Sequence, residues 1–154
     1  MRIIRAVTEG GEVVQAALRP GGAAVRIEGD LYGGYRVTDE PVRVQKRLAP
    51  VAPTDVLGIG LNYRRHADES GMAIPTYPVL FHKGVNSVVG PDDAILLPKG
   101  RSCQEVDYEV ELAVVIGRAC KDVKREDALA CVFGYTVAND VSARDWQIGK
   151  GGGQ

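Results

Sequence analysis

Apolar and polar positions alternate along the first part of the chain in short stretches, as in β-strands joined by tight turns. Glycine pairs at 10–11, 21–22 and 33–34 separate these β-prone stretches. Glycine supplies turn conformations, so this pattern predicts a small β-rich N-terminal domain over residues 1–50. Pro50 and Pro53 follow, and they indicate a connector, because proline and the residue before it resist helix formation.

From residue 55 onward the apolar stretches lengthen, and strands remain the dominant expectation. One or two helical turns are predicted over 64–72, ended by Gly71, and a longer helix over 123–133 with Asp122 as its N-cap. No internal repeat or heptad pattern is present, so the expected class is α+β. The expected strands cover 56–63, 78–83, 87–98 (a pair around a Pro-Asp-Asp turn), 106–117 and 134–142.

Composition is that of an ordinary globular protein, with 45% hydrophobic and 25% charged residues. Lysine and arginine total 19 against 20 acidic residues, and the formal net charge of -1 gives no reason to invoke nucleic acid or an anionic membrane. No apolar run approaches the ~20 residues that span a bilayer. The first residues do not have the apolar core of a secretory signal, so a cytoplasmic location is expected.

Three cysteines, at 103, 120 and 131, form neither an even set nor a C-x-x-C pair. This spacing argues against a disulfide framework and against a thiolate zinc site. Free thiols that behave as small hydrophobic residues are the simpler interpretation.

Candidate chemistry is concentrated in carboxylates. Glu109 and Glu111 lie two residues apart on an expected strand, so their side chains share one face, and Asp140 follows on the next strand. Flanking apolar residues at 112 and 114–116 predict that the strand is buried. Three carboxylates without neighbouring Cys or His describe an all-oxygen site that favours Mg²⁺, Mn²⁺ or Ca²⁺. The alternative is a solvated strand face whose charges take part in structural ion pairs.

Two further groups of polar residues are candidates. His66 and Glu69 are three apart in the expected helical turns, where the carboxylate could orient the imidazole, or form only an exposed ion pair. Arg144 could bind a substrate carboxylate through its two-pronged guanidinium, or pair with Asp145 or another acid. Gln147 has an amide that can both donate and accept.

Four blocks stand within residues 56–147, in the order IGLNYRRHADESGM, PVLFHK, VDYEVELAVVIG and GYTVANDVSARDWQ. Together, in this order, they resemble the signature series of the fumarylacetoacetate hydrolase family. The resemblance is to bacterial acylpyruvase and 2-hydroxyhepta-2,4-diene-1,7-dioate isomerase-like members. It implies a mixed sheet or β-roll with a few short helices, and residues 54–154 as the N-terminal part of the catalytic domain.

The resemblance also implies roles for the candidate residues. A divalent cation, usually Mg²⁺, would be held by Glu109, Glu111 and Asp140, with His66 and Glu69 as a catalytic dyad on a lid segment. Arg144 and Gln147 would face the substrate. His82 stands where the family usually has an apolar residue and is interpreted as structural, and Lys83 receives no role.

The implied activity is hydrolysis of a carbon–carbon bond in a 2,4-dioxo acid such as an acylpyruvate, through a metal-stabilised enolate. Isomerisation or decarboxylation of a dicarboxylic 2-oxo acid, or metal or ligand binding without turnover, are the alternatives. A homodimer is expected. The family's later lysine follows a turn that would begin at Gln154, and the chain ends in a glycine-rich loop, so a fragment lacking about half of the usual length is expected.

Overall fold

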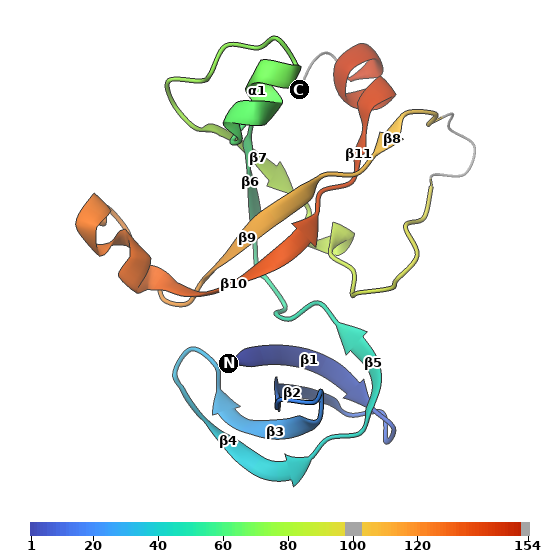
Figure 1. Ribbon diagram of the computed structural model, residues 1–154, viewed down its shortest axis with the longest axis vertical. Coiled ribbons are helices and arrows are strands. Elements are labelled where there is room, and N and C mark those ends of the chain that lie inside the picture. Colours follow the sequence, from blue (N-terminus) through green and yellow to red (C-terminus); the bar gives the residue numbers. More distant parts are fainter. Residues whose placement is uncertain (98–102, 152–154) are drawn as a thin grey trace. The chain divides into compact units, whose positions relative to one another are not determined.

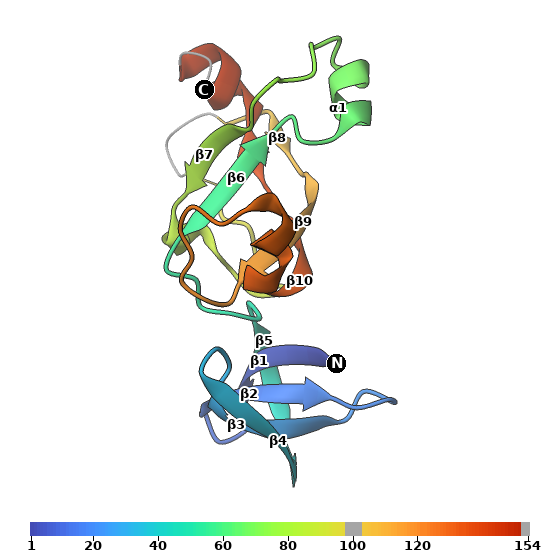
Figure 2. The same ribbon diagram turned by 90° about the vertical axis from the view of Figure 1, so that its left-hand side faces the viewer.

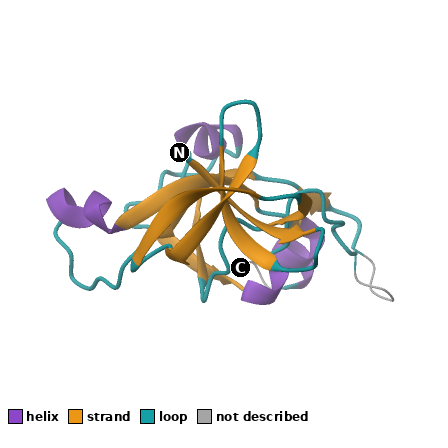
Figure 3. Ribbon diagram, turned by 90° about the horizontal axis from the view of Figure 1, so that it is seen from below, coloured by secondary structure: helices purple, strands orange, loops and turns teal. Residues whose placement is uncertain are grey.

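A computed structural model of the chain describes residues 1–97 and 103–151. Its contacts divide the chain into two compact units, described one at a time below. Unit 1 comprises Met1–Gly29 and Arg36–Asp93, and unit 2 comprises Asp30–Tyr35 and Ala94–Gln154. Strands predominate and the helices are short (Figure 3), which confirms a β-rich α+β class. The division of the chain at residues 50–54 stays a prediction.

The first five strands of the chain form one sheet (Figure 1), in the order β4-β3-β2-β1-β5. β1 runs antiparallel to both β2 and β5. Turns at the predicted glycine pairs connect the strands, and Gly11 and Gly21 have φ values of 81° and 89°, a region that glycine enters without steric cost. The strands are β1 (Arg2–Thr8), β2 (Val13–Leu18), β3 (Ala24–Asp30), β4 (Gly34–Pro41) and β5 (Val44–Leu48).

A small apolar core lies on one face of this sheet. Val14 and Ala16, two apart on β2, point to the same side and pack with Ala24 and Val42. Outside the core, the Arg26 guanidinium donates to both carboxylate oxygens of Glu12, at 2.9 and 2.8 Å, and to Glu40 at 2.9 Å. These ion pairs tie β3 to the segment before β2 and to β4.

The rest of unit 1 is an antiparallel strand pair, β6 (Val56–Gly60) and β7 (Val79–Lys83), with helix α1 (Arg64–Glu69) between them. Gly58 lies opposite Phe81, whose ring occupies the space where a Cβ would stand. Gly71 has a φ of 63° just beyond α1, so the predicted helical turns and their end are confirmed. A 3-10 turn, η1 (Val85–Ser87), follows β7.

Unit 2 is built on an antiparallel hairpin of β9 (Val110–Ile116) and β10 (Val132–Asn139), shown in Figure 2. The 3-10 helix η2 (Arg125–Cys131) joins these two strands. Short strands β8 (Val106–Asp107) and β11 (Ser142–Ala143) pair with each other, and the π-helix η3 (Asp145–Lys150) follows. Within unit 2 the Tyr32 and Phe133 rings meet edge to face, with centroids 5.1 Å apart.

Three local predictions differ from the structure. The helix expected over 123–133 is shorter, because pairing of Val132 with Ile116 already begins β10, and Asp122 is not its cap. The strand expected over 106–117 is interrupted between β8 and β9. The strand pair expected over 87–98 is absent from its described residues; there Asp93 instead accepts the Gly90 amide at 2.8 Å.

Burial along β9 also differs from expectation. Leu112, Val114 and Ile116 were expected to be buried, but 60%, 48% and 55% of each residue is exposed. Strand geometry explains this, because alternate residues face opposite sides and these three share the exposed one. The less exposed side carries Glu111, Ala113 and Val115. Glu109, two residues before Glu111, continues this alternation.

Candidate active site

The three candidate metal ligands lie at one end of the β9–β10 hairpin. Glu109 directly precedes β9, Glu111 lies within it, and Asp140 directly follows β10. Strand register brings them together, since Ala138 faces Glu111 and the Asp140 amide donates to the Glu109 carbonyl at 2.8 Å. The hairpin therefore gathers at one end three acids that are up to 31 residues apart in the chain.

Arg144 lies beside one of these acids, Glu109, and beside a further acid, Asp107. Its guanidinium donates from Nε and Nη2 to Oδ2 of Asp107, at 3.1 and 3.0 Å, and from Nη2 to Oε1 of Glu109. The side chains of Arg144 and Glu109 are each 23% exposed, against 49% for Asp107. Hydrogen bonding to Glu109, above all, raises the pKa of Arg144, with a further contribution from Asp107. The guanidinium is thus permanently charged and held by two acids.

Gln147 and Arg144 are in contact, as neighbours in the expected substrate-binding set. Nη1 of Arg144 donates to Oε1 of Gln147 at 2.8 Å. Because this bond fixes the side-chain oxygen of Gln147, it also fixes the direction in which the amide nitrogen can donate. The structure therefore brings both predicted substrate-binding residues together beside Glu109.

Asp107 is a residue that the sequence interpretation did not single out. Its position two residues before Glu109 is the signal that could have found it, because D-x-E-x-E places three acids at alternate positions of an extended chain. The pairing of Ser142 with Asp107 in β11 and β8 carries Arg144 to it, and the Arg144 amide donates to the Glu105 carbonyl at 2.8 Å.

The acid next to Arg144 in sequence is paired elsewhere. Asp145 accepts a hydrogen bond from Lys150 at 2.8 Å, and this contact is the main cause of its lowered pKa. Lys150 also lies 5.0 Å from the centroid of the Trp146 ring. The ion pair with Asp145 that was considered for Arg144 is therefore replaced by pairs with Asp107 and Glu109.

His66 and Glu69 lie in unit 1, on α1. Both side chains are exposed, and neither forms a hydrogen bond or ion pair with any residue that the structure describes. The other histidine, His82, lies on β7, and its Nδ1 is 3.2 Å from Oδ1 of Asp55. The candidate dyad is thus two neighbouring groups on one short helix, without a direct bond between them here.

The donor atoms gathered at this end of the hairpin are all of one kind. Glu109, Glu111 and Asp140 supply only oxygen ligands, as hard cations such as Mg²⁺ require. Within residues 1–97 and 103–151, no three His, Cys, Asp or Glu side chains are already grouped as a metal site. The ligand type and backbone positions fit a cation, while the Glu109 carboxylate is engaged by Arg144.

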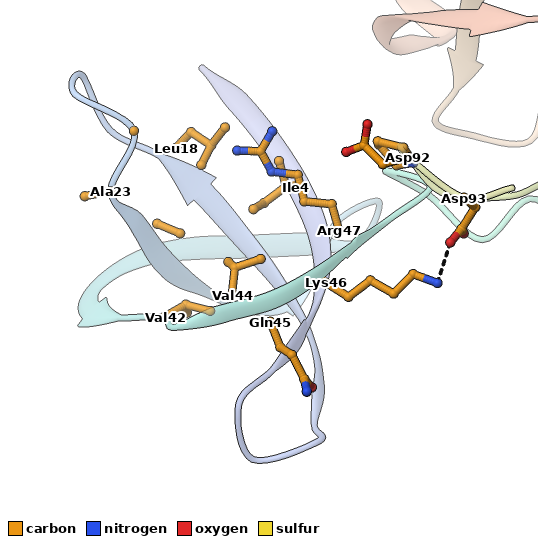
Figure 4. Close-up of a pocket in the computed structure, with 13 residues that line it drawn as sticks. Ile4, Leu18, Ala23, Val42, Val44, Gln45, Lys46, Arg47, Asp92 and Asp93 are labelled. Carbon is orange, nitrogen blue, oxygen red and sulfur yellow. Dashed lines mark ion pairs between the residues drawn. The ribbon is translucent and has the colours of Figure 1, made fainter.

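A separate hollow lies in unit 1, against the five-stranded sheet (Figure 4). This cavity of about 630 Å³ is lined by Ile4, Leu18 and Val44, among others, and the Lys46–Asp93 ion pair of 2.6 Å lies at its edge. None of the predicted site residues lines it.

No helix in the described parts of the chain is long and apolar enough to cross a membrane.

Comparison with known proteins places this site in a family. Residues 55–153 match the family model described as fumarylacetoacetate (FAA) hydrolase C-terminal. The chain belongs to the fumarylacetoacetate hydrolase family. Members of this family typically depend on a divalent metal, and the match includes every candidate site residue described above.

Curated relatives within the fumarylacetoacetate hydrolase family include a "Fumarylacetoacetate hydrolase domain-containing protein 2 homolog" of Dictyostelium discoideum. It is 52% identical over 114 residues, which are 74% of this chain and 37% of that protein. "Oxaloacetate tautomerase FAHD2A, mitochondrial" of Bos taurus is 52% identical over 108 residues, 70% of this chain and 34% of that protein. The chain thus spans about a third of the length of these relatives.

A solved structure of similar fold is 5-carboxymethyl-2-hydroxymuconate delta-isomerase from Mycobacterium smegmatis. It is 34% identical, with a TM-score of 0.83, and the comparison covers 100% of this chain and 59% of that one. This chain therefore has a fold similar to that of the isomerase.

Proposed function

We propose that this protein is a divalent-metal-dependent enzyme that interconverts the enol and keto forms, or double-bond isomers, of a dicarboxylic 2-oxo acid. The observation that carries the proposal is the Arg144–Gln147 pair beside Glu109, which sets a carboxylate-binding group next to an all-oxygen set of candidate metal ligands. The tautomerase and isomerase named above support this reaction class over hydrolysis.

Glu109, Glu111 and Asp140 are proposed to hold the cation, with Mg²⁺ preferred and Mn²⁺ or Ca²⁺ as substitutes. When bound, such a cation supplies positive charge that favours the enolate form of a 2-oxo acid. Glu111 pairs with Ala138, and Asp140 lies two positions beyond Ala138, where its amide donates to the Glu109 carbonyl.

Substrate binding is assigned to Arg144 and Gln147. A guanidinium binds a carboxylate through two parallel hydrogen bonds, so Arg144 suits the second carboxylate of a dicarboxylic acid. The Gln147 amide would donate a further hydrogen bond. These two contacts would orient the substrate and distinguish dicarboxylic from monocarboxylic acids.

Proton transfer is assigned to His66, oriented by Glu69. Enol–keto interconversion moves a proton between carbon and oxygen, and imidazole titrates near neutral pH, so it can both accept and return that proton. Hydrolysis of a 2,4-dioxo acid by His66-activated water remains the competing prediction, and a homodimer is part of the proposal.

The test is to dilute enol-oxaloacetate from an aprotic solvent into buffer and follow the loss of enol absorbance. We expect the protein with Mg²⁺ to accelerate this loss, and excess chelator to remove the acceleration. A panel of acylpyruvates, measured in parallel, tests hydrolysis. Cleavage of acylpyruvates without acceleration of the enol–keto step would replace the proposal by the hydrolase activity.

A further inference from the structure

One arginine bridges a candidate metal ligand and a second acid in unit 2. We infer that Glu109 holds Arg144 until a divalent cation takes that carboxylate, and that Asp107 keeps the arginine in position afterwards. Cation binding would then release the guanidinium edge that binds substrate. This inference rests on the proposed function, because it assigns Glu109 to the cation and Arg144 to the substrate.

The hydrogen bonds of Arg144 divide its guanidinium into two parts. Oδ2 of Asp107 accepts from both Nε and Nη2, at 3.1 and 3.0 Å, and Gln147 accepts from Nη1 at 2.8 Å. Glu109 accepts only from Nη2. Loss of the Glu109 contact alone therefore leaves the arginine anchored by three hydrogen bonds, while Nη2 gains a free donor direction.

Charge explains why the two partners compete for Glu109. The guanidinium bridges two carboxylates that would otherwise repel each other, and the Arg144 and Glu109 side chains are each only 23% exposed. A divalent cation bound by Glu109 would draw on the same oxygen lone pairs and repel the guanidinium. The half-buried setting weakens screening by water, so the competition is stronger than for an exposed pair.

Asp107 is then a positioning residue. Its carboxylate is 49% exposed and sits on β8, so it is not among the three proposed cation ligands at the hairpin end. Holding Nε fixes the plane of the guanidinium, and the freed edge points away from Asp107. The resulting order is cation first and dicarboxylic acid second.

Isothermal titration of Mg²⁺ into native protein and the Arg144→Gln variant tests the competition, with 2-oxoglutarate, a dicarboxylic 2-oxo acid, then titrated at saturating Mg²⁺. We expect Arg144→Gln to tighten Mg²⁺ binding roughly 3- to 10-fold and to weaken 2-oxoglutarate binding by roughly 10-fold. Arg125→Gln removes the same charge at the far end of the hairpin, on η2, and should change neither constant more than about twofold.

A second variant tests the anchor. Asp107→Asn should weaken 2-oxoglutarate binding roughly 3- to 10-fold in the native background and have no further effect on Arg144→Gln. A merely structural role would weaken both ligands in every background. If native protein binds Mg²⁺ and Arg144→Gln binds Mg²⁺ equally well or more weakly, this inference is wrong and the proposed function is not affected. Native protein that binds no Mg²⁺ overturns the proposed function as well.

Discussion

The amide of Asp140 donates a 2.8 Å hydrogen bond to the carbonyl of Glu109, and this bond closes the β9–β10 hairpin at its candidate metal end. Two proposed ligands are therefore fixed to each other through their backbones. The third, Glu111, is fixed by its pairing with Ala138 in the same hairpin. Backbone pairing positions groups more precisely than a loop does, so these three acids are held at one end of the hairpin.

The first prediction concerns these carboxylates. Glu109→Gln and Asp140→Asn should each weaken Mg²⁺ binding at least about 10-fold, because each removes a charged oxygen ligand while keeping its shape. Isothermal titration measures the affinity, and circular dichroism checks the fold. Glu126→Gln removes an exposed acid from η2 and serves as the control. Unchanged Mg²⁺ affinity in both site variants would refute the ligand assignment.

The two histidines make a matched pair for the second prediction. His66→Asn should slow the enol–keto reaction by roughly 10²- to 10⁴-fold, the usual contribution of general acid–base catalysis, with little change in Mg²⁺ affinity. His82→Asn should leave the rate within about twofold, since the side-chain hydrogen bond observed for His82 is to Asp55, which is not a site residue. An equal loss of rate in both variants would show that His66 has no special role.

The third prediction concerns stability. A Cβ at Gly58 would lie 2.2 Å from the Phe81 ring, so Gly58→Ala should destabilise the protein by about 1–3 kcal/mol. Urea unfolding followed by circular dichroism measures this change. Gly134→Ala is the control, because the space around a Cβ at this strand glycine is open to 4 Å. Equal midpoints for the two variants would show that Phe81 moves aside without cost.

The fourth prediction is a pH dependence. Hydrogen bonding to Arg26 lowers the pKa of Glu12 in the folded state. As pH falls, Glu12 is protonated at a higher pH in the unfolded chain than in the folded protein. The Glu12–Arg26 pair therefore stabilises the fold above the ordinary carboxyl range. This contribution is lost as pH falls through the folded-state pKa of Glu12.

Glu12→Gln should therefore lower the urea midpoint at pH 7 but approach the native midpoint as pH falls through the folded-state pKa of Glu12. Glu9→Gln is the control, because Oε2 of Glu9 lies 3.7 Å from Nη1 of Arg43, too far for a hydrogen bond. A constant gap between Glu12→Gln and native protein across this range would contradict the prediction.

Local patterns predicted much of the fold. Gly71 ends α1 as its sequence context indicated, and the apolar stretch around Val115 forms a strand. The helix after Asp122 was predicted too long, because long-range pairing of Val132 with Ile116 overrides local helix preference. Burial of Leu112 was wrong for a related reason: composition indicates that a strand is apolar, whereas burial depends on what covers each face.

The candidate site was predictable in part. The spacing of Glu109 and Glu111 and the family resemblance of the Asp140 region indicated the carboxylate set. The partners of Arg144 were not predictable, since Asp107 and Glu109 lie 37 and 35 residues away along the chain. The β8–β11 pairing brings these side chains together, and a single sequence holds no record of that pairing.

The most direct test of the central claim is a titration of oxalate, which resembles the enolate of a 2-oxo acid, into the protein with and without Mg²⁺. We predict binding with Mg²⁺, none with chelator, and loss of the Mg²⁺-dependent binding in Glu109→Gln. Oxalate binding that is the same with Mg²⁺ and with chelator, or that survives in Glu109→Gln, would contradict the proposal that Glu109, Glu111 and Asp140 form a metal site for a 2-oxo acid.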